Sequence, residues 1–138
     1  MWNRLWTIGV KVPDLNRELE MHARLGNAVI LDETVAFAGK SYRLPLLRVA
    51  DKYMHLGERM IYEDALGLNL PCGIVHLVYT TGDFASEVRA AEDAGAYMLL
   101  DPAEIIGGFG RRKIAFFRSP GGMIFEIIEI LENRVPEV

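Results

Sequence analysis

The chain contains a weak internal repeat in which equivalent residues lie 69 positions apart. Pairs related by this offset are Thr7 and His76, Asp14 and Asp83, Glu18 and Glu87, and Gly26 and Gly95. Repetition at a fixed offset is typical of a fold built from copies of one structural unit. We therefore expect two half-domains that face each other across a shared cleft, where small-molecule sites are usually placed.

The length of 138 residues suits one compact domain and is too short for two. Hydrophobic residues make up 51% of the chain, which is enough for a single core. The two halves are thus expected to be modules of one domain spanning 1–138. Module 1 covers about 1–64, a linker about 65–71, and module 2 about 72–138.

Each half shows the same order of predicted elements. An alternating strand (5–12 or 74–80) precedes an aspartate cap and a helix (14–25 or 84–94) that a glycine closes. Further strands are predicted at 28–31, 34–37, 42–49 and 54–62 in the first half, and at 96–100, 112–118 and 123–130 in the second. The pattern predicts an α+β fold of two βαβββ modules in tandem, forming a half-open barrel with a central cleft.

Alternation along a strand sorts the side chains between the two faces of the sheet. In the first strand Trp6, Ile8, Val10 and Val12 are expected under the helix, which leaves Leu5, Thr7, Gly9 and Lys11 on the open face. In the second module the open face carries Ile74, His76, Val78 and Thr80 on one strand and Ile124, Glu126, Ile128 and Ile130 on another.

His76 and Glu126 are residue types that bind first-row divalent ions, and they lie on equivalent faces of two strands. The alternative is structural: His76 is a satisfied core histidine, and Glu126 pairs with an arginine such as Arg118. Glu58 precedes Glu126 by 68 residues, which makes it the expected counterpart in module 1. The repeat would then bring Thr7, Glu58, His76 and Glu126 to one centre.

Charge and composition exclude several classes of partner and of cellular location. A net charge of −4 gives no basic field for nucleic acid, and Arg111-Arg112-Lys113 is interpreted as solvated surface. No apolar run approaches the roughly 20 residues of a membrane span, and the N-terminal residues do not resemble a secretion signal. The single cysteine, Cys72, fits a reducing compartment. A cytoplasmic protein is expected, with no nucleic-acid or membrane partner.

Three segments resemble the vicinal oxygen chelate superfamily: Thr7-Ile-Gly-Val-Lys-Val-Pro-Asp-Leu15, Val75-His76-Leu77, and Ser119-Pro-Gly-Gly-Met-Ile-Phe-Glu126. The superfamily includes glyoxalase I, methylmalonyl-CoA epimerase, extradiol dioxygenases, and the bleomycin- and fosfomycin-resistance proteins. The resemblance implies a divalent ion (Zn, Ni, Fe, Mn or Co) held by His76, Glu126 and Glu58. Thr7 stands where metal-binding members have a histidine, so a metal-free protein is equally compatible. His22 lies on a predicted helix and His55 has the opposite parity to Glu58, so neither is expected to complete the set of metal ligands.

Two functions follow from the resemblance. One is a metal-dependent isomerase, lyase or dioxygenase with Glu126 or Glu58 as the catalytic base. The other is a metal-free protein of the bleomycin-resistance type that binds an antibiotic or another small ligand among aromatic side chains. Thr7, Tyr62, Phe116 and Arg118 are the expected substrate-pocket residues. A partner-binding module has no positive feature in its favour. A homodimer is also expected, because two half-open sheets leave apolar surface to cover.

Overall fold

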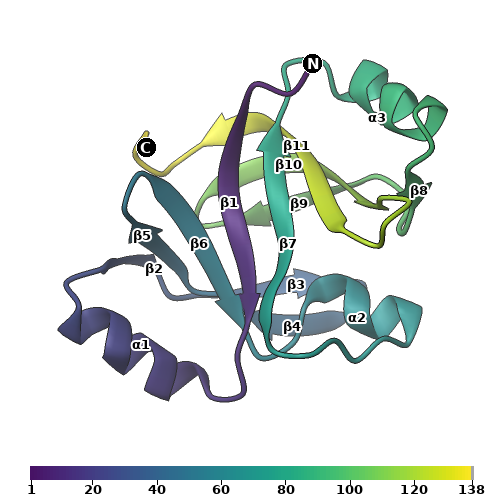
Figure 1. Cartoon of the computed structure of the whole chain (residues 1–138). Helices are drawn as coiled ribbons and strands as arrows, with labels where there is room; N and C mark the ends of the chain where they lie inside the picture. Colours follow the sequence, from purple (N-terminus) through teal and green to yellow (C-terminus); the bar gives the residue numbers. More distant parts are fainter. Residues whose placement is uncertain (138) are drawn as a thin grey trace.

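The computed structural model describes residues 1–137, whose strands form a strongly curled sheet with helices on its outside (Figure 1). The first half contains β1 (Arg4–Lys11), α1 (Leu15–Arg24), β2 (Ala28–Leu31), β3 (Thr34–Phe37), β4 (Lys40–Arg43), β5 (Leu46–Val49) and β6 (Lys52–Gly57). A short helix, α2 (Ile61–Leu66), begins the connection. The second half contains β7 (Gly73–Thr80), α3 (Phe84–Asp93), β8 (Tyr97–Met98), β9 (Ala103–Gly107), β10 (Gly110–Arg118) and β11 (Ile124–Asn133).

The strands of both halves join one sheet with the order β2-β5-β6-β1-β7-β11-β10-β8, and β9 pairs with β10. The first strands of the two modules, β1 and β7, are antiparallel neighbours at its centre. On either side, β6 runs parallel to β1 and β11 runs parallel to β7. This symmetry confirms the α+β fold of two repeated modules. The β3–β4 hairpin forms a separate two-stranded sheet.

The helix signals of the repeat are confirmed in both copies. Asp14 accepts a hydrogen bond from the Arg17 backbone N–H at 3.1 Å, and Asp83 accepts one from Ser86 at 3.3 Å. Gly26 and Gly95 follow the helices with φ of 80° and 100°, a left-handed conformation that glycine adopts without strain. Within residues 1–137, the longest helix falls short of what a bilayer-spanning segment needs.

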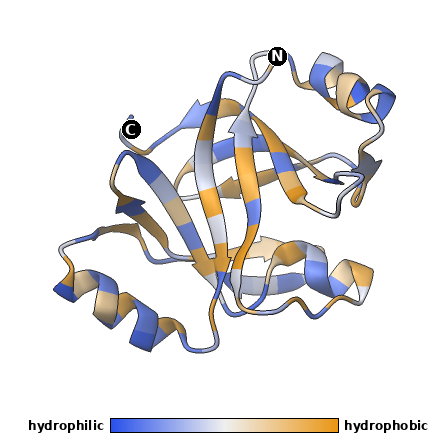
Figure 2. Cartoon of the chain, viewed as in Figure 1, coloured by the Kyte–Doolittle hydropathy of each residue, from blue (hydrophilic) through white to orange (hydrophobic). Residues whose placement is uncertain are grey.

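The core has three parts. α1 covers module 1 with Leu15 packed against Leu47 and Leu56, and α3 covers module 2 with Phe84 and Val88. The third and largest part fills the inside of the curl and takes residues from both modules. Figure 2 shows hydrophobic residues concentrated in the central strands and hydrophilic residues frequent in α1.

Trp6 does not lie under α1 as expected. The register between β1 and β7 shifts between Leu5 and Thr7, so an extra residue reverses the side-chain alternation at this point. The Trp6 indole therefore turns into the curl, where its ring centroid lies 5.6 Å from that of Tyr53.

Two further expectations about module 1 are wrong. The strand predicted over 42–49 is interrupted at Leu44 and Pro45, because a proline has no N–H to continue a ladder. The strand predicted over 54–62 ends at Gly57, and α2 begins at Ile61. The carboxylate of Glu63 accepts from the Met60 backbone N–H at 2.8 Å, which satisfies the start of this helix.

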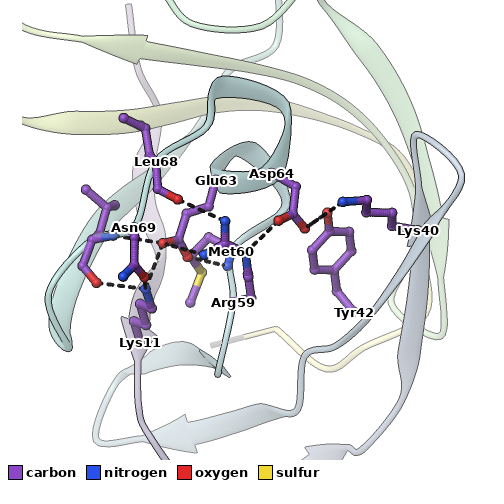
Figure 3. Close-up of polar contacts among 10 residues, drawn as sticks. Lys11, Lys40, Tyr42, Arg59, Met60, Glu63, Asp64, Leu68 and Asn69 are labelled. Atoms are coloured by element: carbon purple, nitrogen blue, oxygen red, sulfur yellow. Dashed lines mark hydrogen bonds and ion pairs between the residues drawn. The ribbon is translucent and has the colours of Figure 1, made fainter.

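A buried ion pair fixes α2 against β1 (Figure 3). Lys11 Nζ lies 2.7 Å from Glu63 Oε2, with side-chain exposures of 7% and 0%. The same ammonium donates to Asn69 Oδ1 at 3.0 Å and to the Leu70 carbonyl at 2.7 Å. Burial would raise the pKa of Glu63, but the hydrogen bonds from Lys11 and from backbone N–H groups lower it overall. The network holds the adjacent Tyr62 in a fully buried position.

Candidate active site

A cavity of about 60 Å³ lies inside the curl, and both modules of the same chain build its wall. The wall is mainly apolar and includes the rings of Trp6, Tyr62, Phe109 and Phe116. Its strongly polar members are His55 on β6, His76 on β7, Arg112 on β10 and Glu126 on β11. Strands from both sides of the β1–β7 seam therefore bring these side chains to one place.

The Glu126 carboxyl faces this cavity without a partner from the protein. It lies on β11 opposite Val78 of β7 and Phe116 of β10, and the residue is 9% exposed. Within residues 1–137 it makes no hydrogen bond or ion pair. Burial raises the pKa of Glu126 to about 8. At neutral pH the carboxyl is therefore mostly protonated and can both donate and accept a hydrogen bond.

His76 is held in a fixed orientation by Gly9 and Tyr62. A hydrogen bond of 3.1 Å joins His76 Nδ1 and the Tyr62 hydroxyl. The ring lies across Gly9, where an added Cβ would come within 2.3 Å of Cε1 and 2.4 Å of Nε2. Burial and the neighbouring His55 lower the pKa of His76 to about 3, so its imidazole stays neutral. Nε2 has no protein partner in the described chain.

His55 is the structural counterpart of Glu126, and Glu58 is not. Gly9 pairs with His55 across β1 and β6, while Val78, the repeat equivalent of Gly9, pairs with Glu126 across β7 and β11. The offset between His55 and Glu126 is thus 71 and not 69. Module 2 has two more residues than module 1 between its first strand and this position. His55 and Glu58 do have opposite parity, but it is His55 that faces the cavity.

The Glu58 carboxylate has a different environment. It accepts a hydrogen bond from the Leu15 backbone N–H at 2.8 Å, at the start of α1. Glu58 is not part of the cavity wall. The parity of the strand was the available signal for His55, since Tyr53 on the same face is also buried in the curl.

The environment of His55 is aromatic and positively charged. Its ring meets those of Trp6 and Phe109 edge-on, with centroid distances of 6.2 Å in both cases. Burial and then the charge of Arg112 lower the pKa of His55 to about 4, so this imidazole is also neutral. Neither ring nitrogen has a protein hydrogen-bond partner among residues 1–137.

The remaining predicted site residues divide into two groups. Tyr62 and Phe116 line the cavity. Thr7 is fully buried but is not in the cavity wall, and its Oγ1 has no hydrogen-bond partner among residues 1–137. Arg118 is opposite Ile124 at the end of β10 and is not in the cavity wall. The suggested pairing of Glu126 with Arg118 is absent from the described chain.

Arg112 was interpreted as solvated surface, and this is wrong. The residue is 1% exposed and lies on the inner face of β10, whereas its neighbours Arg111 and Lys113 are exposed. Its guanidinium is 5.2 Å from the ring centroids of both Trp6 and Phe109. The available signal was parity, since Arg112 alternates in step with Ile114 and Phe116 of the cavity wall.

Two imidazoles and a carboxyl are ligand types for a first-row divalent ion. Within residues 1–137, however, no three His, Cys, Asp or Glu side chains lie close enough together to hold one. The Arg112 guanidinium, which would repel a cation, also lines the cavity. As placed, these residues do not fit a metal centre.

Solved structures of similar shape are known, although no protein-family model and no curated protein matches the sequence. A methylmalonyl-CoA epimerase from Streptomyces coelicolor, solved with 2-nitronate-propionyl-CoA, superposes with a TM-score of 0.72 over 96% of this chain and 100% of its own. Its sequence identity is 23%. This chain has the vicinal oxygen chelate fold.

Two other similar structures support the assignment of the fold. The methylmalonyl-CoA epimerase of Mycobacterium tuberculosis has a TM-score of 0.68 and 20% identity, covering 93% of this chain and 88% of its own. A hypothetical protein of Bacillus halodurans has a TM-score of 0.70 and 18% identity, covering 94% and 96%. At these identities the likeness concerns the fold and not the activity.

Proposed function

We propose that this chain is an enzyme that binds a small organic molecule in the central cavity and transfers a proton to or from it through Glu126. The observation that carries the proposal is the convergence of Glu126, His76 and His55 on one mainly apolar cavity. Among residues 1–137, the Glu126 carboxyl, His76 Nε2 and the His55 ring nitrogens have no hydrogen-bond partner. Such an arrangement costs stability, because buried polar groups are normally hydrogen-bonded. Perturbed ionisable groups in a cavity are typical of catalytic sites.

The groups have properties suited to proton transfer next to a carbonyl. A carboxyl group with a pKa of about 8 is a much stronger base, once ionised, than an ordinary glutamate. When Tyr62 donates its hydroxyl hydrogen to His76 Nδ1, the imidazole carries its own proton on Nε2. A neutral imidazole can then donate to the oxygen of a carbonyl or enolate. Isomerase and lyase reactions both use this combination.

The size of the cavity limits the substrate. The space of about 60 Å³ has room for several water molecules, since one water needs only roughly 10–15 Å³ of such space. A molecule larger than this space enters only if part of the wall moves. The β3–β4 hairpin supplies Val35 to the wall and belongs to a sheet of its own, so we expect it to be the part that moves. A small substrate is favoured over a polycyclic or peptide antibiotic.

A divalent-metal enzyme is the second candidate, with the ligand types of His55, His76 and Glu126 in its favour and their placement against it. The three side chains would have to approach one another on binding, and Glu126 would have to lose its proton. The metal would supply a Lewis acid for an oxygen of the substrate. A homodimer stays a prediction.

Deuterium incorporation from D₂O tests the proposal. Small ketones, 2-oxoacids and thioesters are incubated with the protein, and exchange at the carbon next to the carbonyl is followed by NMR. We expect at least one class to exchange, and Glu126→Gln to slow it about 10²–10⁴-fold. Glu58→Gln is the matched control and should keep the rate. Equal rates for wild type and Glu126→Gln would refute the proposal.

Metal analysis of the same preparations separates the two candidates. Exchange that persists after chelation favours the metal-independent enzyme. A stoichiometric ion that is lost in both His55→Gln and His76→Gln favours the second candidate. Binding of an aromatic ligand without any exchange would instead support the non-enzymatic binding protein.

A further inference from the structure

Arg112 is a buried cation without a carboxylate partner. The residue is 1% exposed, and no salt bridge to it exists within residues 1–137. A buried charge is costly unless an opposite charge or a full set of hydrogen bonds compensates it. Glu126, the carboxylic acid in the cavity wall, makes no ion pair with Arg112.

The hydrogen bonds of the guanidinium are incomplete. Nη1 donates to the backbone carbonyls of Arg111 and Glu132, and Nη2 donates to Asn133 Oδ1 at 3.0 Å. Nε is buried and has no acceptor within the described residues 1–137. The rings of Trp6 and Phe109 add favourable cation–π contacts, but a ring face does not replace an anion. The compensation for the charge is thus partial.

Arg112 and Glu126 both line the cavity and are separated along the strands. Arg112 pairs with Ile130 on β11, and Glu126 lies four residues before Ile130 on the same strand and the same face. At about 3.3 Å per residue, the two positions are separated by roughly 13 Å along the sheet. Trp6 and Phe109 surround Arg112, Tyr62 and His76 lie toward Glu126, and His55 lies across Gly9 from His76.

We propose that the molecule bound in this cavity carries a carboxylate, which pairs with Arg112, while its reactive carbon lies at the Glu126 end. The inference rests on the proposed function and names the class of its substrate: a small monocarboxylate with an apolar body. A guanidinium recognises a carboxylate by charge and by parallel hydrogen bonds, and an aromatic surrounding strengthens both by excluding water.

Isobutyrate and isobutyramide are suitable probes, because they have nearly the same size and differ in charge. Binding is followed by the ¹H–¹⁵N signal of the Trp6 indole, which lines the cavity beside Arg112; Trp2→Phe assigns the signal. We expect isobutyrate to bind wild type at least tenfold more tightly than isobutyramide. Arg112→Met should abolish this preference, and Arg111→Met, which removes an exposed neighbouring charge, should keep it.

The comparison of the two probes in wild type needs no variant and decides the question even if Arg112→Met does not fold. Equal affinities for isobutyrate and isobutyramide overturn the inference. A preference that survives in a folded Arg112→Met protein also overturns it, as does an unchanged Trp6 signal with both probes at about 50 mM.

Failure of the inference and failure of the proposed function give different results. Glu126→Gln should keep the preference for isobutyrate while it slows deuterium exchange. If carboxylates bind but no carbonyl compound exchanges, the proposed function fails and carboxylate recognition stands. If only neutral compounds exchange, the function stands and carboxylate recognition fails.

Discussion

The imidazole of His76 lies so close over Gly9 that the Cβ of an alanine would approach Cε1 to 2.3 Å and Nδ1 to 2.6 Å. We therefore predict that Gly9→Ala displaces the ring, breaks its bond to Tyr62, and lowers the free energy of unfolding by about 1–3 kcal/mol. Urea unfolding measures the loss. Gly82→Ala is the control, since its Cβ would meet only Asn3 Nδ2 at 4.0 Å. A Gly9→Ala protein as stable as wild type, with the His76 signals unchanged, would contradict this placement.

His55 and Glu58 offer a direct test of which module 1 residue belongs to the site. We predict that His55→Gln lowers the exchange rate at least tenfold, because the imidazole faces the cavity. Glu58→Gln should leave the rate unchanged and lower stability by less than about 1 kcal/mol, since glutamine still accepts from the Leu15 N–H at the start of α1. Exchange assays and urea unfolding of both variants provide the comparison. The reverse pattern would assign the role to Glu58.

Glu126 should make stability depend on pH. The unfolded chain ionises this group near its ordinary pKa of 4.5, whereas the folded chain keeps the proton up to about 8. The folded state thus binds more protons between these values, and the contribution of Glu126 to stability falls as pH rises through this window. Glu126→Gln cannot ionise, so its stability relative to wild type should increase by a few kcal/mol from pH 4 to pH 8.

Urea unfolding at several pH values tests this dependence, with the exposed Glu92→Gln as the control. A constant difference between Glu126→Gln and wild type across the window would show that Glu126 ionises normally in the folded chain.

The Lys11–Glu63 pair should contribute strongly to stability. We predict that Lys11→Met lowers the free energy of unfolding by about 3 kcal/mol, because it leaves the buried Glu63 carboxylate with Arg59 Nη1, 3.5 Å away, as its nearest cation. The exposed pair of Arg24 and Glu20 is the control, and Arg24→Met should cost less than about 0.5 kcal/mol. Adding Glu63→Gln to Lys11→Met should recover part of the loss. Similar losses for Lys11→Met and Arg24→Met would argue against a buried pair.

Thr7→Val should be neutral or slightly stabilising. The Thr7 hydroxyl is buried and has no hydrogen-bond partner, and valine has nearly the same shape. Thermal unfolding checks the stability, and the exchange assay checks whether the hydroxyl contributes to the site. A loss of more than about 1 kcal/mol would mean that the hydroxyl has an acceptor in solution.

Much of the fold could be predicted because its signals are local. Asp14 and Asp83 cap their helices, and Gly26 and Gly95 end them, through interactions within a few residues of the sequence. The register shift at Trp6 could not be predicted, since the pairing of β1 with β7 causes it and the composition of the strand does not change. The helix α2 was missed because Met60, Ile61 and Tyr62 continue an apolar run, while Lys11, far away in the sequence, stabilises the helix through Glu63.

The same contrast between local signals and long-range interactions applies to the candidate site. Strand alternation placed His76 and Glu126 correctly on the inner face. The repeat offset pointed to Glu58 instead of His55, because two additional residues in module 2 change the offset from 69 to 71 before Glu126. Alternation could have identified Arg112, which has the same parity as Phe116, but the basic residues on either side of it favour the interpretation as solvated surface.

The pairing of β1 with β7 has a consequence for how the molecule can be divided. A cut in the segment between α2 and β7 would leave each fragment with a bare backbone edge whose hydrogen-bonding partners lie on the other fragment. Neither piece could satisfy that edge alone, so the two should recombine when mixed. Reassociation of the two fragments would restore the cavity between them. The chain could then be used as a split reporter, in which binding of a ligand in the cavity signals that the fragments have met.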